Sequence, residues 1–262
     1  MSVAAPRRAA RGRALAAVTA GTLAIVLPAG QDATAASPTD SGDRVLSNGR
    51  SLSRWAYVMG RTWARRSPTS SSRRVKRLGR YVRGTGSREL VLVLRERTAA
   101  DGIVWVKARL PMRPNNTTGW LPRGRLGPYR PVRKLLVVDR DRLRAALLDF
   151  RSGGPRRVWA SRIGVGVRRW PTPRGRFYVR ERLAIARSRR LRAWYGPFAF
   201  GTSAHSPTLT GGNWGEGVVG IHGTGWPWLI PGRISHGCIR VPNYKIQRLR
   251  RLMPLGTPIR VR

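Results

Sequence analysis

The sequence predicts a mainly β protein: a small N-terminal β-barrel module, followed by a mostly-β domain with a short helix near its C-terminus. Two observations lead to this prediction. Apolar residues occur in short runs, often alternating with polar ones, which is the pattern of strands rather than of long helices. Turn-forming residues separate the runs, and the 262-residue chain contains 30 glycines and 19 prolines.

The first β-rich region covers residues 53–127. It follows residues 36–52, whose serine, aspartate, threonine and glycine content is typical of a flexible linker. Short strands with turn residues between them favour a small barrel. We expect strands at 55–58, 75–82, 90–94, 103–110 and 119–121, and a hinge at the Gly-Pro-Tyr-Arg-Pro segment 127–131.

The second region covers residues 130–262. Strands are expected at 134–139, 143–150, 158–167, 218–221 and 259–261, and residues 211–215 and 225–234 are expected to be loops. The loop 225–234 is expected to cover a cleft. A helix should begin at Pro242-Asn243 and run to Met253, with Ile246, Leu249 and Leu252 on one face. Segment 191–200 contains four aromatic residues and is either core or the wall of a groove.

The N-terminus has the features of a secretory signal peptide over residues 1–35. Four arginines precede an apolar run, and Ala33-Thr34-Ala35 offers a small-x-small cleavage site. The run is slightly short for a membrane span, and Pro28 interrupts it near its end. We therefore predict export, with an uncleaved anchor as the alternative. An exported chain with one cysteine forms no internal disulfide.

The formal net charge is +41, and cleavage after Ala35 would lower it to +38 by removing four arginines and Asp32. Such a charge indicates an anionic neighbour, although arginine-rich codon usage explains it equally well. Export argues against nucleic acid, and membrane contact is expected only if the signal stays uncleaved. An anionic cell-wall polymer is the remaining candidate partner.

Cys238, the only cysteine, lies close in sequence to His222 and His236, two of the three histidines. A histidine can accept the thiol proton and so activate the sulfur as a nucleophile. Gly223 and Gly237 stand beside these residues, where backbone must approach a substrate or form a turn. A buried structural thiol is the alternative. Zinc needs three or four ligands and only one more histidine exists, so neither a metal nor a cofactor is expected.

His222, together with Ser235-His236-Gly237-Cys238, resembles the signature of the L,D-transpeptidase (YkuD-type) catalytic domain. The strand ending in Gly-Val-Gly at 164–166 and the Thr-Pro-Arg-Gly turn at 172–175 are similar to the same family. In the first region, residues 105–111 and 119–121 bear a weaker resemblance to a bacterial Src-homology-three-type module.

The family resemblance implies a role for each matching residue. Cys238 would be the nucleophile. His222, oriented by the carbonyl of Gly223, would be the general base that forms a thiolate–imidazolium pair with it. His236 would tune the thiolate or position substrate. Backbone N–H groups of Gly237 and Cys238 would form an oxyanion hole. Ser235, Trp226 and Arg240 would bind substrate, with Arg240 gripping a carboxylate.

The resemblance further implies a cell-wall enzyme that carbapenems would acylate. It would attack peptidoglycan stem peptides, release D-alanine through a cysteine acyl-enzyme, and form 3-3 cross-links. With water as the acceptor, the same site would be an L,D-carboxypeptidase. The alternatives from other classes are a non-catalytic, basic wall-binding protein and an exported cysteine peptidase.

Overall fold

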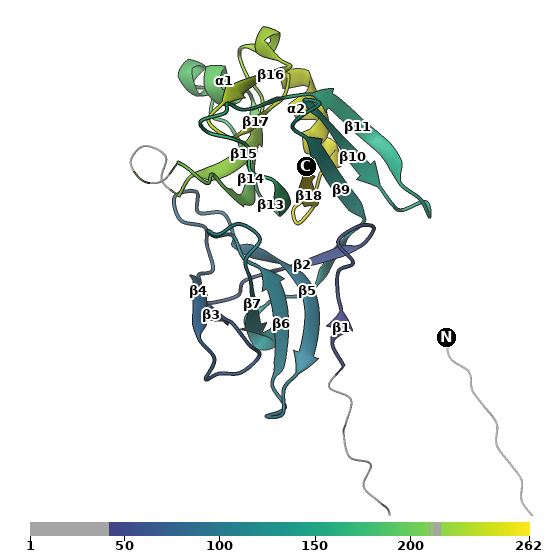
Figure 1. The fold of residues 1–262 in the computed structure, drawn as a ribbon, viewed down its shortest axis with the longest axis vertical. Helices are drawn as coiled ribbons and strands as arrows, with labels where there is room; N and C mark the ends of the chain where they lie inside the picture. The colour runs from purple at the N-terminus through teal and green to yellow at the C-terminus, as the bar shows by residue number, and fades with distance from the viewer. Residues whose placement is uncertain (1–41, 210, 212–215) are drawn as a thin grey trace, which may run out of the picture. The chain divides into compact units, whose positions relative to one another are not determined.

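The computed structural model describes residues 42–209, 211 and 216–262 (Figure 1). The predicted signal peptide and most of the predicted loop 211–215 lie outside the described residues. Two β-sheets contain all the named strands of the described chain, which confirms the mainly β prediction. None of the helices in the described residues has the length and apolar character needed to cross a membrane.

The first sheet is antiparallel, in the order β4-β3-β7-β6-β5-β2-β8, with β1 paired to β5. Its core contains buried side chains such as Val91, Val93 and Val106. The predicted Src-homology-three-type barrel stays a prediction. The strands are β1 (Arg44–Val45), β2 (Ser53–Tyr57), β3 (Thr62–Arg65), β4 (Arg74–Leu78), β5 (Leu90–Thr98), β6 (Val104–Arg109), β7 (Thr118–Pro122) and β8 (Arg130–Val132), with the short 3-10 helix η1 (Arg123–Arg125) after β7.

The ends of this sheet extend beyond the predicted module 53–127. β1 lies inside the predicted flexible linker, where Leu46 is buried against the core of the first sheet. β8 lies after the predicted hinge begins, yet it pairs with β2 through Val132 and Ser53. The strand pairing of the first sheet therefore runs from residue 44 to residue 132.

The second sheet is mixed, in the order β11-β10-β9-β18-β13-β14-β15-β17-β12-β16. β9 with β18, β15 with β17, and β12 with β16 are parallel pairs, and the others are antiparallel. The strands are β9 (Lys134–Asp139), β10 (Arg144–Asp149), β11 (Arg156–Arg162), β12 (Gly164–Gly166), β13 (Gly175–Ala184), β14 (Phe198–His205), β15 (Val218–His222), β16 (Gly232–Ser235), β17 (Ile239–Arg240) and β18 (Pro258–Val261), with the 3-10 helix η3 (Pro227–Leu229) before β16.

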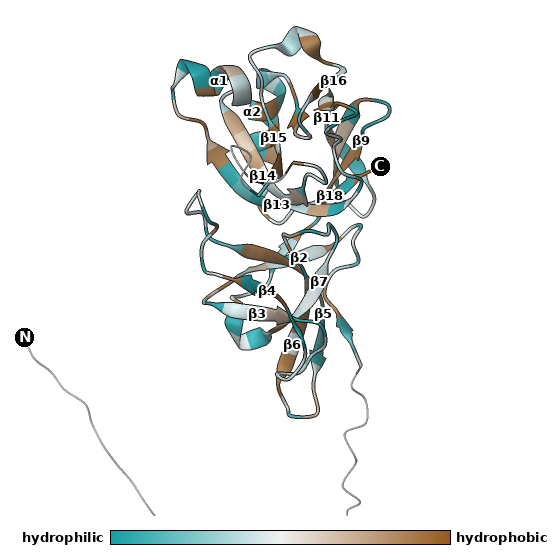
Figure 2. Ribbon diagram, turned by 60° about the vertical axis from the view of Figure 1, so that its left-hand side comes forward, coloured by the Kyte–Doolittle hydropathy of each residue, from teal (hydrophilic) through white to brown (hydrophobic). Residues whose placement is uncertain are grey.

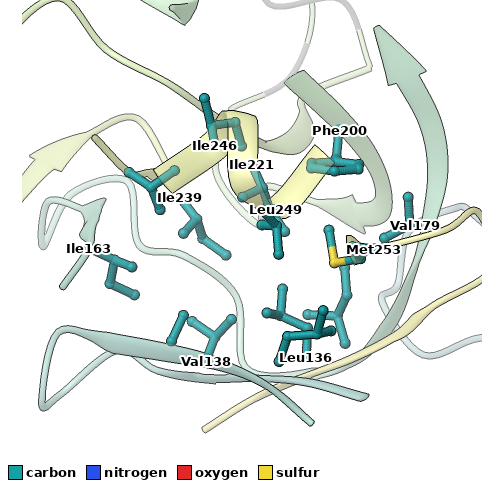
Figure 3. Close-up of a cluster of buried hydrophobic side chains, with 14 of the residues drawn as sticks. Leu136, Val138, Ile163, Val179, Phe200, Ile221, Ile239, Ile246, Leu249 and Met253 are labelled. Atoms are coloured by element: carbon teal, nitrogen blue, oxygen red, sulfur yellow. The ribbon is translucent and has the colours of Figure 1, made fainter. Parts of the chain in front are cut away.

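Helix α2 (Asn243–Leu252) confirms the predicted C-terminal helix and covers the core of the second sheet. Ile246, Leu249 and Met253 point toward Ile221 and Leu136 of the strands (Figure 3). Helical spacing of these apolar residues explains why the helix forms here. Along β10, buried positions alternate with exposed or partly exposed ones. Hydrophobic and hydrophilic residues are interspersed along the strands of both sheets (Figure 2).

Three details of this region differ from the sequence prediction. The expected loop 225–234 contains η3 and the start of β16. The expected strand 158–167 is two strands, β11 and β12, separated at the fully buried Ile163. Segment 191–200 contains helix α1 (Arg189–Tyr195), which we did not predict. The Ser188 hydroxyl caps its first turn by accepting from Leu191 N, and Gly196, with φ 62°, ends it.

A buried ion pair joins the two sheets. Arg180 of β13 donates from Nε to Oε1 of Glu89 at 2.8 Å and from its terminal nitrogen to the other carboxylate oxygen. Both side chains are almost fully buried. Burial disfavours the charged guanidinium, but the bonds and charge of Glu89 outweigh it and hold the pKa of Arg180 above its ordinary value. Each of the two buried charges is therefore stabilised by the other.

The loop between β6 and β7 makes a second connection between the two sheets. Arg113 donates to three backbone carbonyls of the β14–β15 connection, those of Ser206, Leu209 and Glu216, at 2.7 to 2.9 Å. Asn115 exchanges two hydrogen bonds with the backbone of His205, at 2.7 and 2.9 Å. This loop thus satisfies backbone groups in the segment that leads into β15.

Replacing Glu89 with alanine should lower the free energy of unfolding by about 3–5 kcal/mol, because Arg180 would remain buried without its partner. Urea unfolding of the full chain measures the change. The double variant Glu89→Met/Arg180→Met should recover most of the loss. As a control, Arg174→Ala removes an exposed pair with Asp141 and should cost less than about 1 kcal/mol. Equal losses in the buried and the exposed variant would contradict the argument.

Candidate active site

Parallel pairing of β15 with β17 brings the predicted residues together. Ile221 is aligned with Ile239, and His222 with Arg240. Side chains two residues apart lie on the same face of a strand. His222, Cys238 and Arg240 therefore share the face opposite the two isoleucines. All three line a cavity of about 430 Å³, whose other lining residues are Arg190, Leu191, Trp194, Tyr195, Ser235 and His236.

His222 is held by a short hydrogen bond between its Nδ1 and the carbonyl oxygen of Gly223, 2.6 Å long. A carbonyl only accepts, so the proton of the neutral ring is on Nδ1 and Nε2 is free to accept one. The ring is buried and meets the edge of Tyr195 at a centroid distance of 5.1 Å. Burial is the main cause that lowers the pKa of His222 to about 4.

The Cys238 thiol lies beside Gly220. Its Sγ accepts a hydrogen bond from the Gly220 backbone N–H at 3.4 Å. A Cβ added at Gly220 would lie 3.9 Å from both Sγ and the His222 ring, an ordinary contact distance, so the Gly220 backbone borders both groups. Burial raises the pKa of Cys238, while the Gly220 N–H and the charge of Arg240 lower it. The surroundings thus favour a neutral thiol beside a neutral imidazole.

The turn before Cys238 is held by two hydroxyl groups. Ser235 Oγ donates to the carbonyl of Cys238 at 2.6 Å and accepts from Gly237 N at 3.1 Å. Thr172 Oγ1 donates to the carbonyl of Gly237 at 2.8 Å and accepts from Gly166 N at 2.9 Å. Gly237 has φ 114°, a conformation that side chains disfavour.

These bonds bear on two predicted roles. The N–H of Gly237 is already used by Ser235, which leaves the N–H of Cys238 as the other predicted oxyanion donor. Ser235 lines the cavity, but its hydroxyl is already hydrogen-bonded within the turn. The predicted substrate-binding role of Ser235 stays a prediction. Thr172 was assigned only to a structural turn by the sequence. The structure places its hydroxyl directly on the turn that carries Cys238.

Arg240 is a buried cation without a carboxylate partner among the described residues. Its Nε is buried and has no hydrogen-bond partner there, and its guanidinium lies 5.8 Å from the Trp194 ring. Burial lowers the pKa of Arg240. Such a group gains most from an anion that enters the cavity.

The remaining predicted residues lie differently. His236 lines the cavity and contacts Trp170, with ring centroids 4.4 Å apart and the ring planes tilted by 43°. Burial lowers the pKa of His236. Trp226 is not among the lining residues and instead meets the edge of Trp194 at 5.0 Å. Helix α1, which the sequence did not predict, forms one wall of the cavity. No residue of the predicted loop 225–234 lines it.

Segment 191–200 was expected to be either core or the wall of a groove, and the structure shows that it contributes to both. Leu191, Trp194 and Tyr195 form the groove wall, and each remains about two-fifths exposed. Phe198 and Phe200 of β14 belong to the core instead. In the described ranges, no group of three or more histidine, cysteine, aspartate or glutamate side chains is placed to hold a metal ion.

A cysteine and a histidine that line one cavity of a mostly-β domain have the arrangement of a cysteine nucleophile with a histidine base. Comparison with known proteins identifies the family. The model of the L,D-transpeptidase catalytic domain (YkuD) matches residues 133–261. Residues 133–261 therefore belong to this family, as their resemblance predicted. A search of curated proteins finds no match.

Three solved structures are similar in part. Bd1075 of Bdellovibrio bacteriovorus is 24% identical, with a TM-score of 0.39, over 50% of this chain and 47% of its own. An L,D-transpeptidase from Stackebrandtia nassauensis is 17% identical, with a TM-score of 0.35, over 49% and 55%. The catalytic domain of the E. faecium L,D-transpeptidase is 24% identical, with a TM-score of 0.34, over 49% and 96%. This chain thus spans about half the length of the first two.

Stability should fall as the pH drops from 6.5 toward 4. His222 and His205 both have pKa values lowered to about 4, so in this window the unfolded chain binds more protons than the folded one. Each histidine should contribute a loss of about 3 kcal/mol. Urea unfolding at several pH values measures it.

Glutamine does not titrate, so His222→Gln and His205→Gln should each remove about half of this pH dependence. A dependence that is unchanged in both variants would show that other groups cause it.

Proposed function

We propose that this chain is a peptidoglycan L,D-transpeptidase that uses Cys238 as its nucleophile and His222 as its general base. The observation that supports this most strongly is the hydrogen bond from His222 Nδ1 to Gly223, because it leaves Nε2 as an acceptor in the cavity that contains the thiol. The family of residues 133–261 supplies the reaction class.

In the first half-reaction, Cys238 Sγ attacks the carbonyl carbon of the third residue of a donor stem peptide. His222 Nε2 takes the thiol proton as the sulfur–carbon bond forms. The backbone N–H of Cys238 donates to the oxyanion. The carbon–nitrogen bond then breaks, and His222 returns the proton to the amine of the departing D-alanine, which leaves a thioester on Cys238.

In the second half-reaction, the side-chain amine of another stem peptide attacks the thioester carbonyl. His222 accepts a proton from this amine and gives it to the departing sulfur, which restores the thiol. One peptide bond has replaced another, so no ATP is needed for the 3-3 cross-link. Water in place of the amine would make the same site an L,D-carboxypeptidase.

The neutral thiol and imidazole affect the first step. Since burial favours the uncharged forms of both groups, the thiolate–imidazolium pair expected from the family resemblance is disfavoured before a substrate binds. Arg240 binds a carboxylate of the stem peptide, and Trp194 and Tyr195 of α1 contact its backbone and side chains. The proposed setting is the cell wall, after export directed by residues 1–35.

Incubating residues 36–262 with a carbapenem should add one drug mass, because such β-lactams imitate the acyl donor. Intact mass spectrometry reads the adduct. Cys238→Ala should show none, whereas His205→Gln, a buried histidine outside this cavity, should react normally. A wild-type chain that is folded and reduced yet gains no mass would favour the non-catalytic wall-binding alternative.

Arg240→Gln should lower kcat/KM for a stem-peptide donor by about 10- to 100-fold, the range of a charge-assisted hydrogen bond. Arg240→Lys should recover part of the loss by restoring the charge. Arg233→Gln offers a matched control, because Arg233 is half-exposed and pairs with Asp141 outside the cavity. Chromatographic assay of D-alanine release measures the rates, and equal losses at Arg233 and Arg240 would rule out a specific carboxylate contact.

A further inference from the structure

A second cavity, of about 310 Å³, lies between strands of the two sheets and shares no residue with the active-site cavity. Strands β5 and β6 of the first sheet and β13 and β18 of the second supply most of its lining. Five cationic side chains line it, and no aspartate or glutamate does: Arg95, Lys107, Arg109, Arg176 and Arg260.

Most of this charge is uncompensated. Arg95 pairs with Asp43 at 2.7 Å. For the other four side chains, no carboxylate of the described chain comes within 4.0 Å. Four cations around one small cavity repel one another, and a ligand with two or more negative charges relieves that repulsion best.

Arg109 shows that this cavity is more than a patch of surface charge. The residue is half-buried, and its Nε is buried with no hydrogen-bond partner among the described residues. Its terminal nitrogen makes only two long contacts, both 3.4 Å, with Asn116. Burial and the neighbouring charge of Arg176 lower its pKa. The folded chain thus keeps a partly desolvated guanidinium that an anion would satisfy.

The rest of the lining indicates an organic ligand. Leu94, Phe177 and Ile259 give the cavity an apolar side, and Asn48 and Thr118 add polar groups. The volume lies at the lower end of the range for small-molecule sites. An anion with a short carbon skeleton attached fits both parts of the lining better than a bare inorganic ion does.

We propose that this cavity binds the phosphate group of an organic phosphate, either a phosphomonoester or one unit of a phosphodiester chain. A phosphate carries up to two charges and several acceptor oxygens, which matches the surplus of guanidinium and ammonium donors. The site is independent of the proposed catalysis, since neither Cys238 nor His222 lines it.

The test is isothermal titration of the full chain with glycerol 3-phosphate and with an oligomer of glycerol phosphate, at fixed ionic strength. Saturable binding of one glycerol 3-phosphate per chain is expected. Binding at least about tenfold tighter for the oligomer would identify the phosphodiester chain as the ligand, and the reverse order the monoester. Succinate, a dianion without phosphate, should bind at least about tenfold more weakly than glycerol 3-phosphate.

The double variant Arg109→Gln/Arg176→Gln should weaken binding by at least about tenfold. The control Arg61→Gln/Arg83→Gln removes the same charge from two exposed positions outside the cavity and should change affinity less than about twofold. Both variants should acylate with a carbapenem at the wild-type rate, which keeps a failure of this site distinct from a failure of the proposed catalysis.

If the double variant does not fold, Arg176→Gln alone serves, because this side chain is exposed. Three results would overturn the proposal: no saturable binding to the wild type, equal weakening in the site and control variants, or succinate binding as tight as that of glycerol 3-phosphate.

Discussion

The active site depends on the parallel pairing between β15 and the two-residue strand β17. Its register directs Ile221 and Ile239 into the core (Figure 3), while His222 and Arg240 are aligned on the opposite face. A slip of one residue would exchange these faces. The hydrophobic burial that holds the strands together therefore also helps to place His222 and Cys238 in one cavity. Packing of α2 in the same core as the two isoleucines therefore helps to position the residues of the site.

The distribution of carboxylates gives the arginines different roles. The chain has 52 lysines and arginines but only 11 aspartates and glutamates, so most cations have no acidic partner available. Glu89 neutralises Arg180, where an unpaired charge would be buried between the sheets. Arg240 is buried and Arg109 is half-buried, both without such a partner, and each lines a cavity. The unpaired buried arginines are thus found where a ligand can supply the anion.

The local pattern of the sequence was enough to predict the β class, helix α2 and the grouping of His222 with Cys238. Helix α1 was not predicted, because it has only seven residues and none of them is buried. Its sequence therefore lacks the apolar stripe that indicates a helix. Its capping residues, Ser188 and Gly196, were the features of the sequence that could have indicated where this helix begins and ends. The cavity wall from α1, the ion pair of Glu89 with Arg180 and the cluster around Arg109 join distant segments, which spacing along the chain does not reveal.

The surroundings of the proposed nucleophile and base have a chemical consequence beyond packing. A thiolate is both the better nucleophile and the form that oxidants attack, and the proposed export would bring the chain into an oxidising environment. The raised pKa of Cys238 and the lowered pKa of His222 both favour the neutral forms of the proposed nucleophile and base. The hydrogen bond to Gly223 meanwhile keeps Nε2 ready as the acceptor. The proposed site thus holds its base in position while its surroundings disfavour a standing thiolate before a substrate binds.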